Sequence, residues 1–105
     1  MPEFLPTSAT MYFLADGRRT PLGCIGYRQN GDCADISMVM VARYAPRETG
    51  RRLFVELATV LPKEVKTLVV GVHGQNTPMR RLLQKLEFEE TRSGRFERGR
   101  EPVDA

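Results

Sequence analysis

A strand, a helix and a second strand follow one another in the middle of the chain, and this order restricts the fold more than any other feature. Residues 34–41 have apolar side chains at odd and at even positions, which face opposite sides of a strand. This pattern predicts a central strand that is covered on both faces. Apolar residues then recur at helical spacing over 51–61, until Pro62 ends the helix. Residues 68–72 form a short apolar run of the buried-strand type. A crossover of this kind predicts that the two strands are parallel neighbours in one sheet.

Antiparallel strands are expected before this unit. The runs 11–15 and 22–29 have strand composition, and turn signals separate them. Asn30-Gly31 is a strong hairpin signal, because a type I′ turn needs positive φ at both central positions. With this pair at the centre of the turn, Cys24 would face Ser37 and Cys33 would face Arg28. The first part of the chain is therefore predicted to be an antiparallel meander.

A second helix and a final pair of strands are expected after the crossover. Thr77 is the predicted N-cap and Pro78 the first helical residue, followed by an apolar face that ends at Leu86. Strands are predicted over 88–92 and 95–98, with a turn at Ser93-Gly94. The predicted organisation is an N-terminal arm (1–9), one domain (10–98) and a flexible C-terminal tail (99–105).

Composition excludes several classes of protein. The chain has 105 residues, 41% hydrophobic and 28% charged, which allows one globular domain. No apolar run approaches the roughly 20 residues of a membrane span, and the N-terminus lacks the features of a signal peptide, so a cytoplasmic location is expected. Cys24, Cys33 and His73 are too few ligands for a zinc site, no other metal is expected, and two reduced thiols are predicted. His73 is interpreted as a structural residue.

Arginines gather around the start of the first predicted helix, at positions 43, 47, 51 and 52. Arginine forms forked hydrogen bonds with phosphate, and the net charge is +3. Nucleic-acid binding is disfavoured nevertheless, because acids are numerous in the chain and aromatic residues that could stack on bases are sparse near the cluster.

The segment Arg47-Glu48-Thr49-Gly50-Arg51-Arg52 has the properties of an anion-binding loop. A loop that enters a helix directs free backbone N–H groups at one point, and the helix dipole adds positive potential there. Gly50 lets the backbone approach an anion closely. The alternative is a helix-capping loop with solvated arginines.

The element order and three local patterns resemble the GNAT family, the GCN5-related N-acetyltransferases, over roughly residues 11–92. The loop from Arg47 to Arg52 is similar to the family pattern Gln/Arg-x-x-Gly-x-Gly/Ala, which binds the pyrophosphate of acetyl-coenzyme A. Asn76 followed by a helix that ends in Leu86-Glu87-Phe88 looks like the family segment in which an Asn supports the pantetheine arm or the helix start. Ala34-Asp35-Ile36 is similar to the segment that carries the general base in histone-type members.

The sequence also departs from the family pattern. Arg52 replaces a small residue and would either block the coenzyme or add a charge to its phosphates. Leu83 stands where the family has a tyrosine that protonates the leaving thiolate, and Glu87 replaces a glycine. Tyr12, Tyr27 and Tyr44 could substitute only through the fold.

The resemblance implies a GNAT-like mixed sheet of the α+β or α/β class: an antiparallel meander, a βαβ unit, and a C-terminal helix and strands. The family's N-terminal strand and two helices are expected to be missing. An apolar sheet face would then be bare, and a homo-oligomer or a protein partner is expected to cover it.

Two functions follow from the resemblance. The first is acetyl transfer from acetyl-coenzyme A to an amine, with Asp35 as the catalytic base. The coenzyme would be bound by Val39, Val41, Arg47, Glu48, Thr49, Gly50, Arg51, Arg52 and Asn76. The second is a catalytically inactive interaction module in an oligomeric assembly, for example a viral particle or a regulatory complex. A viral protein of this kind would be located in the host cytoplasm or the virion. Asp35 has a simpler reading as an ordinary residue beside a hairpin turn.

Overall fold

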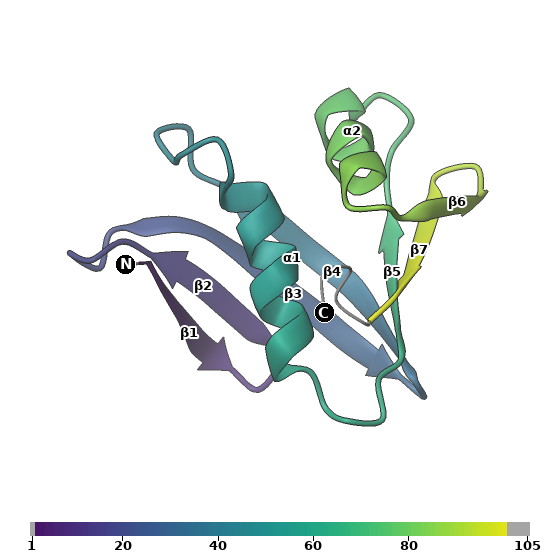
Figure 1. Ribbon diagram of the computed structural model, residues 1–105, viewed down its shortest axis with the longest axis horizontal. Helices are drawn as coiled ribbons and strands as arrows, with labels where there is room; N and C mark the ends of the chain where they lie inside the picture. The colour runs from purple at the N-terminus through teal and green to yellow at the C-terminus, as the bar shows by residue number, and fades with distance from the viewer. Residues whose placement is uncertain (1, 101–105) are drawn as a thin grey trace.

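The computed structural model describes residues 2–100, which form one mixed sheet of seven strands and two helices (Figure 1). The strand order is β1-β2-β3-β4-β5-β7-β6, in which β4 and β5 are parallel and all other neighbours are antiparallel. The elements are β1 (Glu3–Ser8), β2 (Met11–Ala15), β3 (Pro21–Asn30), β4 (Cys33–Val41), α1 (Thr49–Val60), β5 (Thr67–Gly71), α2 (Thr77–Lys85), β6 (Glu89–Arg92) and β7 (Arg95–Gly99). The predicted meander and its parallel crossover are both confirmed.

The N-terminal arm predicted for residues 1–9 is wrong for most of its length. Residues Glu3–Ser8 form β1, which pairs antiparallel with β2. Phe4 stacks on Tyr12 of β2, with ring centroids 4.9 Å apart. Pro6 is tolerated because β1 is an edge strand with one hydrogen-bonded neighbour. No helix of residues 2–100 precedes α1.

The β3–β4 hairpin turns one residue later than predicted. Asn30 pairs with Cys33, so Gly31 and Asp32 form the loop, and Gly31 has the positive φ of 63°. A β-bulge between Gly26 and Tyr27 shifts the register again. Cys24 therefore faces Met40 rather than Ser37, and Cys33 faces Asn30 rather than Arg28. Both cysteines are free thiols, as predicted.

Both helices begin earlier than the sequence pattern indicated. Helix α1 includes Thr49 and Gly50, which were expected in the preceding loop. The N-cap of α2 is Asn76 rather than Thr77, because the Asn76 side chain accepts a hydrogen bond of 3.3 Å from the Met79 amide. Helix α2 ends at Lys85 with Leu86 as its C-cap, and Glu87 follows with φ of 67°.

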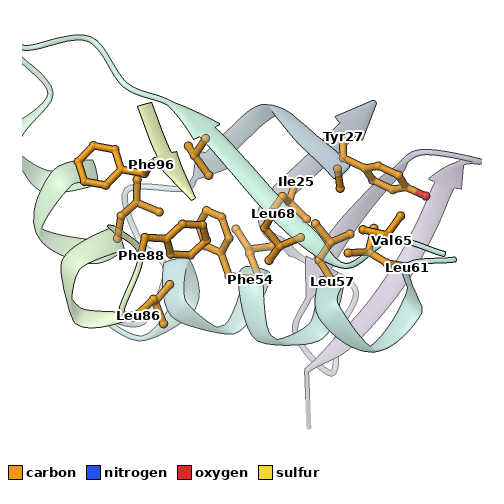
Figure 2. Packing of buried hydrophobic residues seen from close by; sticks show 14 of the residues in the cluster. Ile25, Tyr27, Phe54, Leu57, Leu61, Val65, Leu68, Leu86, Phe88 and Phe96 are labelled. Carbon is orange, nitrogen blue, oxygen red and sulfur yellow. The ribbon is translucent and has the colours of Figure 1, made fainter. Parts of the chain in front are cut away.

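One hydrophobic core joins both helices to one face of the sheet (Figure 2). Leu53, Leu57 and Leu83 are fully buried in it, and the rings of Phe54 and Phe88 meet edge to face with centroids 5.7 Å apart. The expectation that β4 is covered on both faces is wrong for residues 2–100. Met38 is 38% exposed and Met40 is 60% exposed, since they alternate away from the helices.

The tail predicted over 99–105 begins with ordered residues. Gly99 ends β7, and Arg100 donates four hydrogen bonds to backbone carbonyls around the end of α1. Residues 101–105 lie outside the described part of the chain. No helix of residues 2–100 is long and apolar enough to cross a membrane.

Candidate functional site

The parallel pair at the centre of the sheet is hydrogen-bonded over only part of its length. Residues Cys33–Ile36 of β4 pair with Thr67–Val70 of β5. Strand β4 continues to Val41 with no partner on its β5 side among residues 2–100. The two strands diverge toward their carboxyl ends, where both helices begin (Figure 1). An opening at the carboxyl ends of parallel strands is a common position for ligands in α/β sheets.

The first turn of α1 offers unbonded backbone donors at this opening. The Thr49 amide donates to Pro46 O, and the Arg52 amide donates to Glu48 O. The amides of Gly50 and Arg51 have no acceptor within residues 2–100. The first turn contains no acidic residue, and Glu48 makes no side-chain capping bond. The potential at this helix start is therefore positive and suited to an anion.

Gly50 is the point where α1, α2 and β4 meet. A Cβ at this position would lie 3.0 Å from Leu82 Cδ2 and 3.9 Å from Val41 Cγ2. In the sequence, Leu82 is one apolar residue of the second helix, and only the structure shows that it lies beside Gly50. No signal in the sequence marks this contact, because it depends on how α2 packs.

The Arg52 side chain lies along the surface of α1. Its Nε atom is 3.2 Å from Glu56 Oε2, and the two residues are one helical turn apart. This ion pair directs the guanidinium toward the middle of the helix and away from the unbonded amides. Arg47 and Glu48 are exposed in the preceding loop.

Asp35 lies away from the loop. It pairs with Arg28 on β3 and with Val69 on β5, within the hydrogen-bonded part of β4, and it is partly buried. Val41 is six residues further along the strand, a separation of about 20 Å at the usual rise per residue. The structure thus brings Val41 and Gly50 together, whereas Asp35 lies at the closed end of the opening.

Ser37 is a residue that the sequence did not single out. It is the extra residue of the β4 bulge and the first residue beyond the ladder with β5. Its side chain is exposed at the point where the two strands separate. A bulge leaves no mark in the alternation of this apolar strand, so pattern reasoning could not find it.

The position on α2 that corresponds to the family's tyrosine is occupied by a leucine. Leu83 there is fully buried. Tyr12 stacks on Phe4, and the Tyr44 hydroxyl donates to Pro21 O at 2.6 Å. Tyr27 lies in the core, and burial raises the pKa of its phenol. Within residues 2–100 no three His, Cys, Asp or Glu side chains are grouped to hold a metal ion.

The fold is similar to that of several solved acetyltransferases. An acetyltransferase from Thermus thermophilus superposes with a TM-score of 0.74 at 19% identity, over 89% of this chain and 66% of its own. The PaiA N-acetyltransferase of Thermoplasma acidophilum, solved with coenzyme A, gives 0.70 at 22% identity, over 86% and 61%. A GNAT-family acetyltransferase of Staphylococcus aureus gives 0.70 at 11% identity, over 87% and 68%.

Sequence comparison alone does not find these relationships. No protein-family model matches the chain, and no curated protein sequence matches it. The chain spans about two thirds of the length of the three solved structures. Its mixed seven-stranded sheet with two helices is the GNAT fold.

Proposed function

We propose that this chain binds acetyl-coenzyme A at the open edge of β4 and transfers its acetyl group to an amine. The observation that carries the proposal is the position of two unbonded amides, at Gly50 and Arg51, beside the opening between β4 and β5. The PaiA N-acetyltransferase, which has the same fold, was solved in complex with coenzyme A.

The residues present fit such a ligand. Backbone groups of Val39 and Val41, on the edge of β4 that lacks a strand partner within residues 2–100, would hold the pantetheine arm. The unbonded amides of Gly50 and Arg51 would hold the pyrophosphate, with charge added by the side chains of Arg47 and Arg51. The ion pair between Arg52 and Glu56 supports this arrangement, because it keeps the long side chain off the loop. Asn76 would support the coenzyme indirectly, since its carboxamide oxygen caps α2.

Acetyl-coenzyme A supplies an activated acetyl group, and Asp35 would act on the acceptor. As the amine nitrogen forms its bond to the acetyl carbon, Asp35 would take the proton that the nitrogen loses, directly or through one water. The carbon–sulfur bond breaks, and the thiolate leaves. No residue is assigned to protonate that thiolate. The Ser37 hydroxyl lies near the end of the ladder and is the first candidate to test.

A second function is favoured by one specific observation. The tyrosine position of the family is occupied by Leu83, which is fully buried and has no proton to give. This supports a GNAT fold used as an interaction module without catalysis.

Calorimetry with coenzyme A and an assay of thiol release from acetyl-coenzyme A with a generic amine separate the two functions. Micromolar binding with thiol release supports the transferase. Binding without release supports an inactive module that keeps the coenzyme site. No heat at millimolar coenzyme A would overturn the proposed site.

The proposed site has a matched pair of glycine variants. Gly50→Ala puts a methyl group 3.0 Å from Leu82 Cδ2, beside the amides, and is expected to weaken coenzyme A binding tenfold or more. Gly74→Ala adds a methyl group where no atom lies within 4 Å, and it should bind like the parent chain. Equal affinities for the two variants would contradict the placement of the pyrophosphate.

The helix-free face of the sheet is the proposed contact with a second copy of this chain. Met38 and Met40 are exposed there, and the Met38 sulfur lies 3.8 Å from the Cys24 thiol. An apolar surface of this kind favours association. Light scattering after chromatography should give a dimer or larger oligomer, and Met40→Asp should shift it to the monomer. A monomeric parent chain would exclude the homo-oligomer.

A further inference from the structure

A cavity of about 330 Å³ lies between α1, the end of α2 and the end of β7. Its apolar wall is formed by side chains from α1, from β5 and from the connection between α2 and β6: Phe54, Leu68, Leu86 and Phe88. Figure 2 shows Phe54 and Phe88 next to each other, with Leu86 beside them. The volume is at the lower end of the range for small-molecule sites, and the wall can cover an apolar ligand.

The lining of this cavity is strongly basic. Arg51, Lys85, Arg98 and Arg100 line it, and Glu87 is the one acid among the described lining residues. The Arg100 guanidinium donates to backbone carbonyls, which leaves its charge without a carboxylate partner in residues 2–100. Within the same residues, Arg51 and Lys85 also form no ion pair. An apolar wall with excess positive charge at its border is complementary to an amphipathic anion.

We infer that this cavity binds a medium-chain carboxylate, with its alkyl chain against Phe54 and Leu86 and its carboxylate toward Lys85. The alkyl chain is favoured because it removes apolar surface from water. The carboxylate is favoured because an ammonium group forms charge-assisted hydrogen bonds with it. Arg51 is the one residue that this cavity shares with the proposed coenzyme site. The carboxylate and coenzyme A should therefore bind to the same molecule at once, and each site can fail without the other.

Calorimetry of the full chain with sodium octanoate tests the inference. Octanoate should bind more tightly than butanoate, by at most about fourfold for each added CH₂ that is buried. Octan-1-ol lacks the charge and octylammonium reverses it, so both should bind more weakly than octanoate. Added salt should weaken octanoate binding, because part of the attraction is between charges near the surface.

Two lysine variants provide a matched comparison. Lys85→Gln removes a charge at the cavity and should reduce octanoate affinity about threefold to tenfold. Lys63→Gln removes the same charge from an exposed residue that does not line this cavity, and should leave the affinity unchanged. A loss of equal size in both variants would show attraction to net charge alone and would overturn the site.

Ala58→Leu tests the apolar part of the cavity. Ala58 lines the cavity from α1, and leucine retains high helix propensity, so the added side chain should fill space without breaking the helix. Octanoate binding should be lost while the thermal unfolding temperature and coenzyme A affinity stay close to those of the parent chain. Undiminished octanoate binding to the folded variant, or equal binding of octanoate and octan-1-ol by the parent, would overturn the inference.

Discussion

The Nη2 group of Arg100 donates a hydrogen bond of 2.7 Å to the carbonyl oxygen of Leu61, the residue that caps the end of α1. The same guanidinium bonds the carbonyls of Ala58, Pro62 and Val65 at 3.0, 2.6 and 3.2 Å. The last carbonyls of a helix lack partners within the helix and carry partial negative charge. Arg100 therefore ties the end of β7 to the end of α1, two elements far apart in the chain.

Arg100→Ala is expected to lower the free energy of unfolding by about 2 kcal/mol, because it leaves several partly buried carbonyls without a charged donor. Urea denaturation measures the change. Arg43→Ala removes an exposed loop arginine and should change stability by less than about 0.5 kcal/mol. Similar losses in the two variants would mean that the charge of Arg100, rather than its hydrogen bonds, carries the effect.

Glu87→Gly should make the protein more stable by about 1 kcal/mol. Glu87 has φ of 67° directly after α2, and the Phe88 amide bonds Leu83 O across it at 2.9 Å. Glycine adopts this conformation without the Cβ clash that other residues meet. Glu87→Ala serves as the control, since alanine keeps the clash and should give no gain in the thermal unfolding temperature. A gain with alanine as large as with glycine would refute this explanation.

Asp35→Asn should reduce the rate of amine acetylation about 100-fold or more if Asp35 is the base, since asparagine cannot take the proton. The affinity for coenzyme A should stay the same, because Asp35 lies at the closed end of the opening and away from the loop. Asp32→Asn removes a neighbouring carboxylate in the β3–β4 loop and should retain the rate. Steady-state rates with both variants decide the role of Asp35.

Acid should destabilise the protein through Glu90. Its carboxylate accepts hydrogen bonds from the Gly94 amide at 2.9 Å and from Arg80 at 3.0 Å, and these bonds hold the pKa of Glu90 below its ordinary 4.5. A lowered pKa in the folded state gives stability that is complete above the ordinary value and is lost as the pH falls through the lowered value.

The unfolding temperature of the parent should therefore fall as the pH drops below about 4.5. Glu90→Gln should be less stable than the parent at pH 7 and should lose less on acidification. Glu89→Gln, whose carboxylate forms no ion pair within residues 2–100, should follow the parent curve. Parallel curves for the parent and Glu90→Gln would contradict this account.

The element order could be predicted because each signal was local. Proline and glycine residues mark the ends of the apolar runs. The spacing of apolar residues changes from every second residue to a period of 3.6, and this change located α1 between two strands. Strand β1 was missed because Pro6 and the short polar run at its end mask an edge strand, whose partner is known only once the sheet forms. The hairpin turn was predicted one residue too early, because the prediction assumed positive φ at both central residues. Of the two residues in the observed loop, Gly31 alone has positive φ.

Some features of the candidate site could likewise be predicted from the sequence, and others depend on the fold. The helix start from Arg47 to Gly50 was visible because a glycine where a loop enters a helix has a direct physical reading. The direction of the Arg52 side chain was open in the sequence, and the ion pair with Glu56 fixes it. The position of Leu82 over Gly50 and the bulge at Ser37 depend on tertiary packing and strand register, which no single-residue pattern encodes.

Within residues 2–100, the β4–β5 ladder between the two antiparallel halves of the sheet has four residue pairs, Cys33–Ile36 with Thr67–Val70. Each half keeps its own ladders when the angle between the halves changes, so little hydrogen bonding resists a small rotation about this junction. A change in the distance between Val41 and the end of β5 therefore breaks no ladder pair of residues 2–100. A molecule bound between these strand ends would leave the four pairs beside the hairpin turn intact.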